Sequence, residues 1–131
     1  MANWEGYARS NYFKVKDEEK FRAWATGLNL EIYEKGGLFG IASEDGDWPD
    51  QRENEETGES ESIEIVDELA ALLEDGEIVV FQCIGHEKMR YLNGHATAFN
   101  SAGECIDLDL DDIYDKAKRR FNVTAITLAQ Y

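Results

Sequence analysis

Two cysteines and two histidines are the residues of this chain whose types could hold a metal ion or begin nucleophilic chemistry. They are Cys83, His86, His95 and Cys105. Their spacing, C-x2-H-x8-H-x9-C, matches no standard zinc pattern. If a hairpin turn lies at residues 86–87, Cys83 pairs with residue 90 and lies roughly 17 Å from His95. We therefore predict no zinc site, no disulfide and two free thiols in a reducing compartment.

Acidic residues offer the other possible metal ligands. The segment EDGDWPD holds Asp45, Asp47 and Asp50, and it resembles a fragment of a calcium loop. In that loop oxygen ligands alternate and a glycine occupies the sixth position, whereas here the only glycine follows the first aspartate and Trp48-Pro49 interrupts the run. We expect weak, nonspecific cation binding there and no metal or other cofactor.

No hydrolase or phosphate-binding signature occurs in the chain, because the sequence contains no G-x-S-x-G, no phosphate loop and no H-E-x-x-H. His86-Glu87 could supply a general base, but a hairpin tip offers no pocket and no orienting partner. We therefore predict no catalytic residues. A small enzyme or ligand-binding domain built around this hairpin is the alternative, with the candidates His86, Glu87, Arg90, Tyr91 and His95.

Negative charge is concentrated in one segment. The 131 residues include 28 acidic and 13 basic side chains, which gives a formal net charge of −15. Residues 44–77 hold 15 of the acids and a single base, Arg52, so this segment carries −14. A field of this sign opposes binding to nucleic-acid phosphates and anionic membranes, and it favours encounter with a basic protein.

The acidic segment is the predicted partner-binding surface. Carboxylates on a helix face repeat about every 5–6 Å, on a scale similar to phosphates along a DNA strand, so they can occupy a basic groove. Trp48 would add an apolar anchor. The expected partner-binding residues are Asp47, Trp48, Asp50, Glu53, Glu55, Glu56, Glu59, Glu61, Glu64, Asp67 and Glu68. Two other interpretations stay open: a loop that only confers solubility, and cation binding.

Hydrophobic periodicity predicts one α+β domain over residues 1–131, with a mostly antiparallel sheet and the order β-α-β-β-α-β-β-β-α-β. Expected strands cover residues 11–16, 30–33, 38–42, 77–84, 89–99, 104–110 and 123–128, of which the fourth to sixth form a three-stranded meander. Expected helices follow the capping residues Asp17, Ser62 and Asp111, and the second covers residues 63–74. Residues 43–61 are predicted to be a long exposed loop. The side chains predicted to point into the core near the C-terminus are Ile106, Leu108, Leu110, Ile113, Tyr114, Ala117 and Phe121.

In composition the whole chain resembles the small acidic inhibitor proteins of phages and mobile elements. The features that carry the resemblance are the length, the charge of −15, the lack of a catalytic motif and the acidic segment. That group includes anti-CRISPR and anti-restriction proteins, some of them DNA mimics, and toxin-neutralising immunity proteins are similar in the same way. The resemblance implies a non-enzymatic inhibitor that binds a basic, nucleic-acid-binding or nuclease partner. It implies no direct contact with nucleic acid.

The acids occupy about a quarter of the chain, so we expect a local docking patch rather than mimicry of a whole duplex. The N-terminal residues MANWEGYARS lack the apolar stretch of a secretory signal, and no apolar run is long enough to span a membrane. We accordingly expect a cytoplasmic protein that does not bind membranes.

Overall fold

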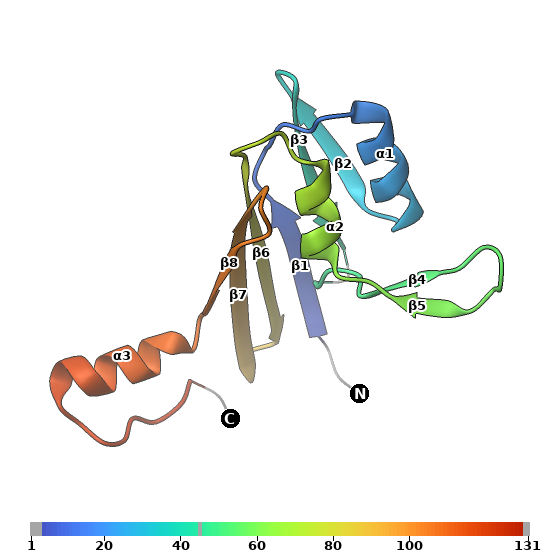
Figure 1. The fold of residues 1–131 in the computed structure, drawn as a ribbon. Coiled ribbons are helices and arrows are strands. Elements are labelled where there is room, and N and C mark those ends of the chain that lie inside the picture. Colours follow the sequence, from blue (N-terminus) through green and yellow to red (C-terminus); the bar gives the residue numbers. More distant parts are fainter. Residues whose placement is uncertain (1–3, 45, 130–131) are drawn as a thin grey trace.

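The computed structural model of the protein describes residues 4–44 and 46–129 and arranges them around a six-stranded antiparallel sheet of order β2-β3-β1-β6-β7-β8 (Figure 1). The strands of this sheet are β1 (Trp4–Ser10), β2 (Glu31–Lys35), β3 (Leu38–Ser43), β6 (Ile78–Glu87), β7 (Tyr91–Asn100) and β8 (Cys105–Asp109). The strands β4 (Gln51–Glu53) and β5 (Ser60–Ser62) form a separate hairpin, and the helices are α1 (Glu18–Gly27), α2 (Ile65–Leu72) and α3 (Asp112–Phe121). The predicted α+β class, the mostly antiparallel sheet and the meander β6-β7-β8 are confirmed.

Helices α1 and α2 cover one face of the sheet, which we call the inner face. Phe21 of α1 packs on Phe13 and Phe39 with ring centroids 5.7 Å and 5.4 Å apart. Leu69 and Leu73, in and just after α2, are completely buried in the same core. Because most of the buried apolar side chains lie between this face and the two helices, the core stabilises the upper part of the sheet in Figure 1.

Local sequence signals explain most element boundaries. The carboxylate of Asp17 accepts a hydrogen bond from the backbone N–H of Lys20 at 3.2 Å, so the predicted cap of α1 is confirmed. The predicted cap of α2 is wrong: Ser62 pairs with Gln51 in the β4-β5 hairpin, and α2 begins two residues later than the range 63–74 with Glu64 as its cap residue.

The N-terminal strand lies earlier than predicted. Residues 11–16 form two isolated bridges, Phe13 with Phe39 and Val15 with Leu73, whereas the regular strand is β1. Its inward positions include Ala8 and Ser10, which are buried but small, so they produce no strong apolar alternation. At the other end of the chain, residues 123–128 form no strand in the part of the chain that the structure describes.

The turn between β6 and β7 lies later than predicted. β6 continues to Glu87, and Lys88 adopts a left-handed conformation with φ 50°. The register consequently shifts by five positions, so that Cys83 pairs directly with His95 instead of with residue 90. The predicted separation of roughly 17 Å between these two residues is wrong.

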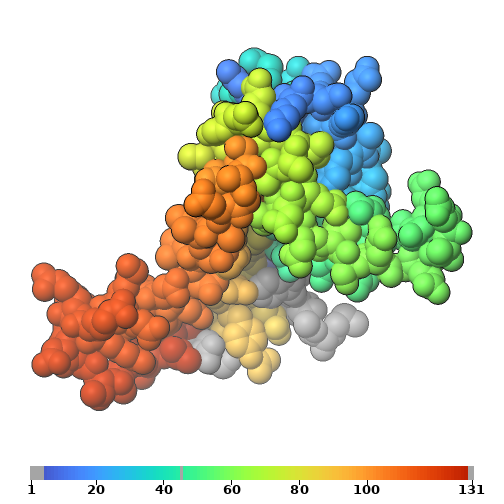
Figure 2. All heavy atoms as spheres, viewed as in Figure 1, coloured from blue at the N-terminus to red at the C-terminus, as the bar shows by residue number. Residues whose placement is uncertain are grey.

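The opposite face of the sheet, which we call the outer face, is covered by none of the described helices. Register places alternate residues of β1, β6, β7 and β8 there, and the predicted inward direction of the C-terminal apolar side chains is wrong. Ile106, Leu108 and Leu110 are exposed on it. Helix α3 extends away from the sheet beyond β8 and buries no residue (Figures 1 and 2). None of the described helices is long and apolar enough to cross a membrane.

Candidate functional site

The β4-β5 hairpin projects from the body of the protein on the side away from α3, as Figures 1 and 2 show. We call residues 51–68, which comprise this hairpin and the first turn of α2, the acidic arm. The segment predicted as a continuous loop therefore contains a pair of short strands, with Arg52 opposite Glu61. An arm of this shape presents its side chains to solvent on both faces.

A compact turn shapes the tip of the acidic arm. The backbone N–H of Asn54 donates to the carbonyl of Glu59 at 2.7 Å, and that of Gly58 donates to the carbonyl of Asn54 at 2.7 Å. The Asn54 side-chain oxygen accepts from the backbone N–H of Glu56 at 2.9 Å. Gly58 takes φ +72°, which favours glycine. The tip is therefore built by its own hydrogen bonds, and it displays carboxylates from a defined backbone.

Arg52 joins the arm to the body. Its Nη1 donates to Glu68 of α2 at 2.8 Å and its Nη2 donates to Glu61 at 3.2 Å. The Nε1–H of Trp24 also donates to Glu68 at 2.8 Å. The hydrogen bond to Glu68 raises the pKa of Arg52, although burial acts in the opposite direction. Glu61 and Glu68, two of the predicted partner-binding residues, are thus engaged within the chain.

The remaining carboxylates of the arm have no such partner. No salt bridge to any of them occurs among residues 4–44 and 46–129, and all are exposed. They are Glu53, Glu55, Glu56, Glu59, Glu64 and Asp67. Since the sole base of residues 44–77 is occupied by Glu61 and Glu68, the field of these six is not neutralised locally.

The ring of Trp48 packs against the core of the protein. Its ring stacks on Phe81 of the inner face with centroids 4.1 Å apart and planes 27° apart. Its Nε1 is buried without a hydrogen-bond acceptor in the described part of the protein. Asp47 and Asp50, beside it, are exposed, and Asp45 lies outside the described residues. The indole therefore packs the segment before the arm onto the sheet, and the predicted role of Trp48 as an apolar anchor for a partner stays a prediction.

The register brings Cys83 and His95 together, which the predicted turn placed roughly 17 Å apart, and it adds Asp109 beside them. Cys83, His95 and Asp109 occupy neighbouring positions of β6, β7 and β8 on the inner face, below the part that the helices cover. They line an open cleft of about 590 Å³ with Asp47 and Asn93. The cleft was missed because its formation depends on where β6 turns, and Lys88 in a left-handed turn has no distinctive sequence signal.

The hydrogen bonds in this cleft form a chain along the strands. His95 Nδ1 lies 2.6 Å from Asp109 Oδ1, and His95 Nε2 lies 3.1 Å from Thr97 Oγ1. The Thr97 hydroxyl donates to Asp107 at 2.6 Å. Asp109 directly, and Asp107 through Thr97, thus orient His95 on the inner face.

The cleft does not activate its cysteine. Burial, and then the charge of Asp47, raise the pKa of the Cys83 thiol. Both ring nitrogens of His95 have partners other than Cys83, so His95 is not in position to take the thiol proton. A cysteine nucleophile requires a lowered pKa or a paired base. Among the described residues no group of three carboxylate, thiol or imidazole side chains converges on a metal position.

The alternative hairpin site is dispersed in the structure. His86 lies on the outer face opposite Leu92, with its Nε2 3.6 Å from Glu5, whereas His95 lies on the inner face. Arg90 and Tyr91 lie at and after the turn, and Arg90 reaches Glu87 at 4.0 Å. The five candidates therefore share no pocket among the described residues. Cys83 and Cys105 are both free thiols.

Comparison of the chain with protein-family models, with curated proteins and with solved structures finds no match in any of the three.

Proposed function

We propose that the protein is a non-enzymatic interaction protein whose acidic arm docks on the basic groove of a nucleic-acid-binding or nuclease partner and competes with the nucleic acid there. The observation that carries the proposal is the arm itself: six exposed carboxylates without a salt bridge among the described residues, four on a hairpin that projects from the body and two at the start of α2. An inhibitor of an anti-defence type, as in anti-CRISPR or anti-restriction proteins, is the class that this surface fits best. A toxin-neutralising immunity protein would use the same contacts.

The shape of the arm supports a groove-binding mode. A two-stranded hairpin places side chains on two faces, and this one projects from the body of the protein. Glu55 and Glu56 lie in the tip, while Glu53 and Glu59 lie at the ends of the paired strands. The carboxylates can therefore contact a partner's lysines and arginines on more than one side of the hairpin, while the sheet itself stays outside the contact.

The charge of the acidic arm would also raise the rate at which the protein associates with a basic partner. Complementary fields speed diffusional encounter by about ten- to a thousandfold at low salt, and the effect declines as the Debye length falls from about 10 Å at 0.1 M salt to about 3 Å at 1 M. The acids of the arm therefore control mainly the association rate and its salt dependence.

The experiment is a capture with a defined competitor. The protein is immobilised and exposed to heparin-retained host proteins at about 50 mM salt. The host proteins that it captures are eluted at about 500 mM salt, and each of them is then bound to a fluorescent 20-base-pair duplex. We expect a captured protein that releases the duplex when our protein is added in stoichiometric amount. Capture that persists at high salt, or a ternary complex that keeps the duplex bound, contradicts the proposal.

Two variants of equal charge locate the effect. The arm variant E53Q/E55Q/E56Q/E59Q removes four of the exposed charges. The control variant E18Q/E19Q/E34Q/E104Q removes four exposed charges elsewhere on the protein. We expect duplex displacement to be lost in the arm variant and kept in the control. Equal losses in both would show that only the net charge matters, and no loss in either is the result that the solubility interpretation predicts.

A further inference from the structure

The outer face of the sheet is an unusually large apolar surface for a chain of this size. Its large exposed side chains come from four neighbouring strands and the residue after β8: Tyr7, Ile78, Ile84, Leu92, Ile106, Leu108 and Leu110. Ile106 is the most exposed at 74% and Leu92 the least at 50%. Together they leave on the order of 700 Å² uncovered, above the largest patch of a typical monomer and near the roughly 800 Å² that each partner contributes to a standard interface.

Helix α3 presents a second apolar surface without a partner. Ile113, Ala117 and Phe121 recur every four residues and form one face of the helix. Ile113 is 59% exposed and Phe121 is 71% exposed. The opposite positions are charged, so the helix is strongly amphipathic. A helix of ten residues with this pattern gains most of its stability from packing its apolar face, yet none of the residues of α3 is buried by residues 4–44 and 46–129.

We infer that the occupant of both surfaces is a second copy of this chain, with α3 of each protomer lying across the outer face of the other. The chain carries the two complementary surfaces itself, and the link between them is short. β8 ends at Asp109 and α3 begins at Asp112. The intervening Leu110 is held by its backbone N–H, which donates to the carbonyl of Gly94 at 2.8 Å. This hydrogen bond continues the β7-β8 pairing one residue past β8, and from there α3 extends away from the sheet (Figure 1).

The dimensions of the two surfaces agree. A ten-residue helix is about 15 Å long at 1.5 Å per residue. The four strands β1, β6, β7 and β8 span about 14 Å, as three intervals of roughly 4.8 Å. One α3 therefore covers the whole apolar width of the partner's sheet, and the reciprocal contact doubles the buried area, as an isologous dimer requires.

Charge permits this contact in spite of the net charge of −15. Helix α2 packs on the inner face, so its acids lie on the opposite side of the sheet from the proposed interface. The last turn of α3 carries Lys118, Arg119 and Arg120. The dimer would consequently hold the two acidic arms apart and bring a basic helix end to each partner.

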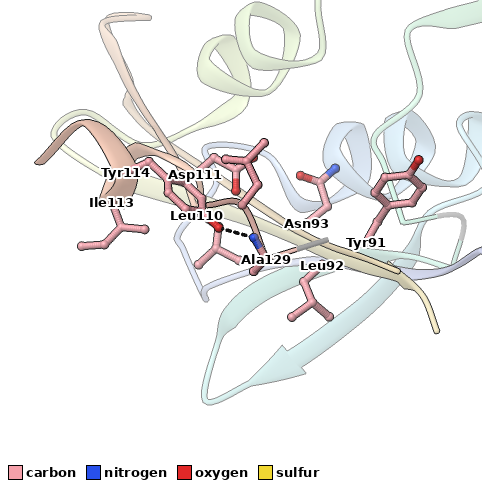
Figure 3. Close-up of a pocket in the computed structure, with 9 residues that line it drawn as sticks. Tyr91, Leu92, Asn93, Leu110, Asp111, Ile113, Tyr114 and Ala129 are labelled. Carbon is pink, nitrogen blue, oxygen red and sulfur yellow. Dashed lines mark hydrogen bonds between the residues drawn. The ribbon is translucent and has the colours of Figure 1, made fainter. Parts of the chain in front are cut away.

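The root of α3 contains a hollow that fits the same arrangement. Figure 3 shows Leu92, Leu110 and Ile113 around a pocket of about 380 Å³, which Leu128 also lines. The Tyr114 hydroxyl accepts a hydrogen bond from the backbone N–H of Ala129 at 2.7 Å and closes one side of it. An apolar side chain of a partner's helix can fill this hollow where the outer face meets α3.

The test is the mass of the full chain in solution by light scattering, at concentrations up to about 200 µM. We expect a dimer of twice 14.9 kDa for the natural chain. Leu108→Glu on the outer face and Phe121→Glu on α3 should each give the monomer mass, since each introduces a charge into both contacts. Both positions are exposed in the chain, so circular dichroism should show unchanged folding. Met89→Glu, at an exposed turn position outside both surfaces, is the matched control and should remain dimeric.

An equimolar mixture of the L108E and F121E variants distinguishes helix exchange from simple stacking of two sheets. In the mixture one α3 and one outer face are both intact, so we expect a heterodimer to form with one of the two contacts restored. A monomeric natural chain at about 200 µM overturns the inference and leaves the face to a different partner or to none. A dimer that survives both substitutions, or a mixture that stays monomeric, also overturns it.

Discussion

At the scale of single residues, the thiol of Cys83 distinguishes a binding protein from a cysteine-based enzyme. Burial and the carboxylate of Asp47 raise its pKa, so its thiolate fraction at neutral pH is lower than that of an ordinary thiol with a pKa of about 8.5. We predict that iodoacetamide alkylates Cys83 on the order of tenfold more slowly than the exposed Cys105 at pH 7.5, as followed by mass spectrometry.

The pH dependence of the alkylation rate of Cys83 gives a second test of its raised pKa. Because the raised pKa moves the rise in alkylation rate of Cys83 toward higher pH, Asp47→Asn should move it back toward lower pH. Cys105→Ser isolates the signal of Cys83. If Cys83 reacts faster than Cys105 at pH 7, the cleft contains an activated nucleophile and the non-enzymatic proposal fails.

Arg52 is the residue that fixes the direction of the acidic arm. Arg52→Met removes its bonds to Glu61 and Glu68 and keeps the aliphatic stem. We predict a loss of about 1 kcal/mol in the free energy of unfolding in urea, with faster amide exchange in β4 and β5, because the pairs are partly exposed. Glu55→Gln, at a carboxylate without a salt bridge, is the control. An unchanged exchange rate in the arm would contradict the anchoring role.

Features that depend on neighbouring residues in the sequence, such as helix caps, were predicted better than contacts between distant residues. The capping role of Asp17 follows from local chemistry and is confirmed. The pairing of Cys83 with His95 depends on a turn whose left-handed residue is a lysine, for which local propensity gives no warning. A shift of five positions in one hairpin thus created a cleft that spacing arguments had excluded.

At the scale of elements, the segment before the acidic arm is attached to the sheet by Trp48. Its stacking on Phe81 makes it part of the packing, in contrast to its predicted role as an exposed anchor. We predict that Trp48→Ala lowers the free energy of unfolding by about 2–3 kcal/mol. This loss is at the lower end of the range for a tryptophan in a protein core, because the side chain of Trp48 is only half-buried. Met89→Ala, at an exposed turn, should change it little. An effect of Trp48→Ala within about 0.5 kcal/mol would place the ring outside the core.

The type of each element was easier to predict than what its apolar face would pack against. The alternation of Ile106, Leu108 and Leu110 predicts an amphipathic strand, and β8 confirms the strand. The side of the sheet on which these residues lie is a tertiary property, and they face away from the helices. The same holds for Ile113 and Phe121, where a helix forms with no core beneath it. The apolar pattern was correctly identified, and in the proposed dimer its partner is the second copy of the chain.

At the scale of the whole molecule, charge and apolar surface are separated in space. The fold class followed from the periodicity of several elements, which agree with one another and so predict one α+β arrangement. The position of the acids followed from counting along the chain. Their projection as an arm depended on the β4-β5 pairing, which is too short and too polar for a sequence pattern to reveal.

In the proposed function the location of the acids, and not their number, drives association with the basic partner. The most direct measurement is the association rate constant of the salt-released partner with the natural chain, the arm variant E53Q/E55Q/E56Q/E59Q and the equally charged control E18Q/E19Q/E34Q/E104Q, at about 50, 150 and 500 mM salt. We predict that the arm variant binds about tenfold more slowly at low salt with a flatter salt dependence, while the control stays within about twofold of the natural chain. Equal rates for the two variants at every salt concentration would contradict the account.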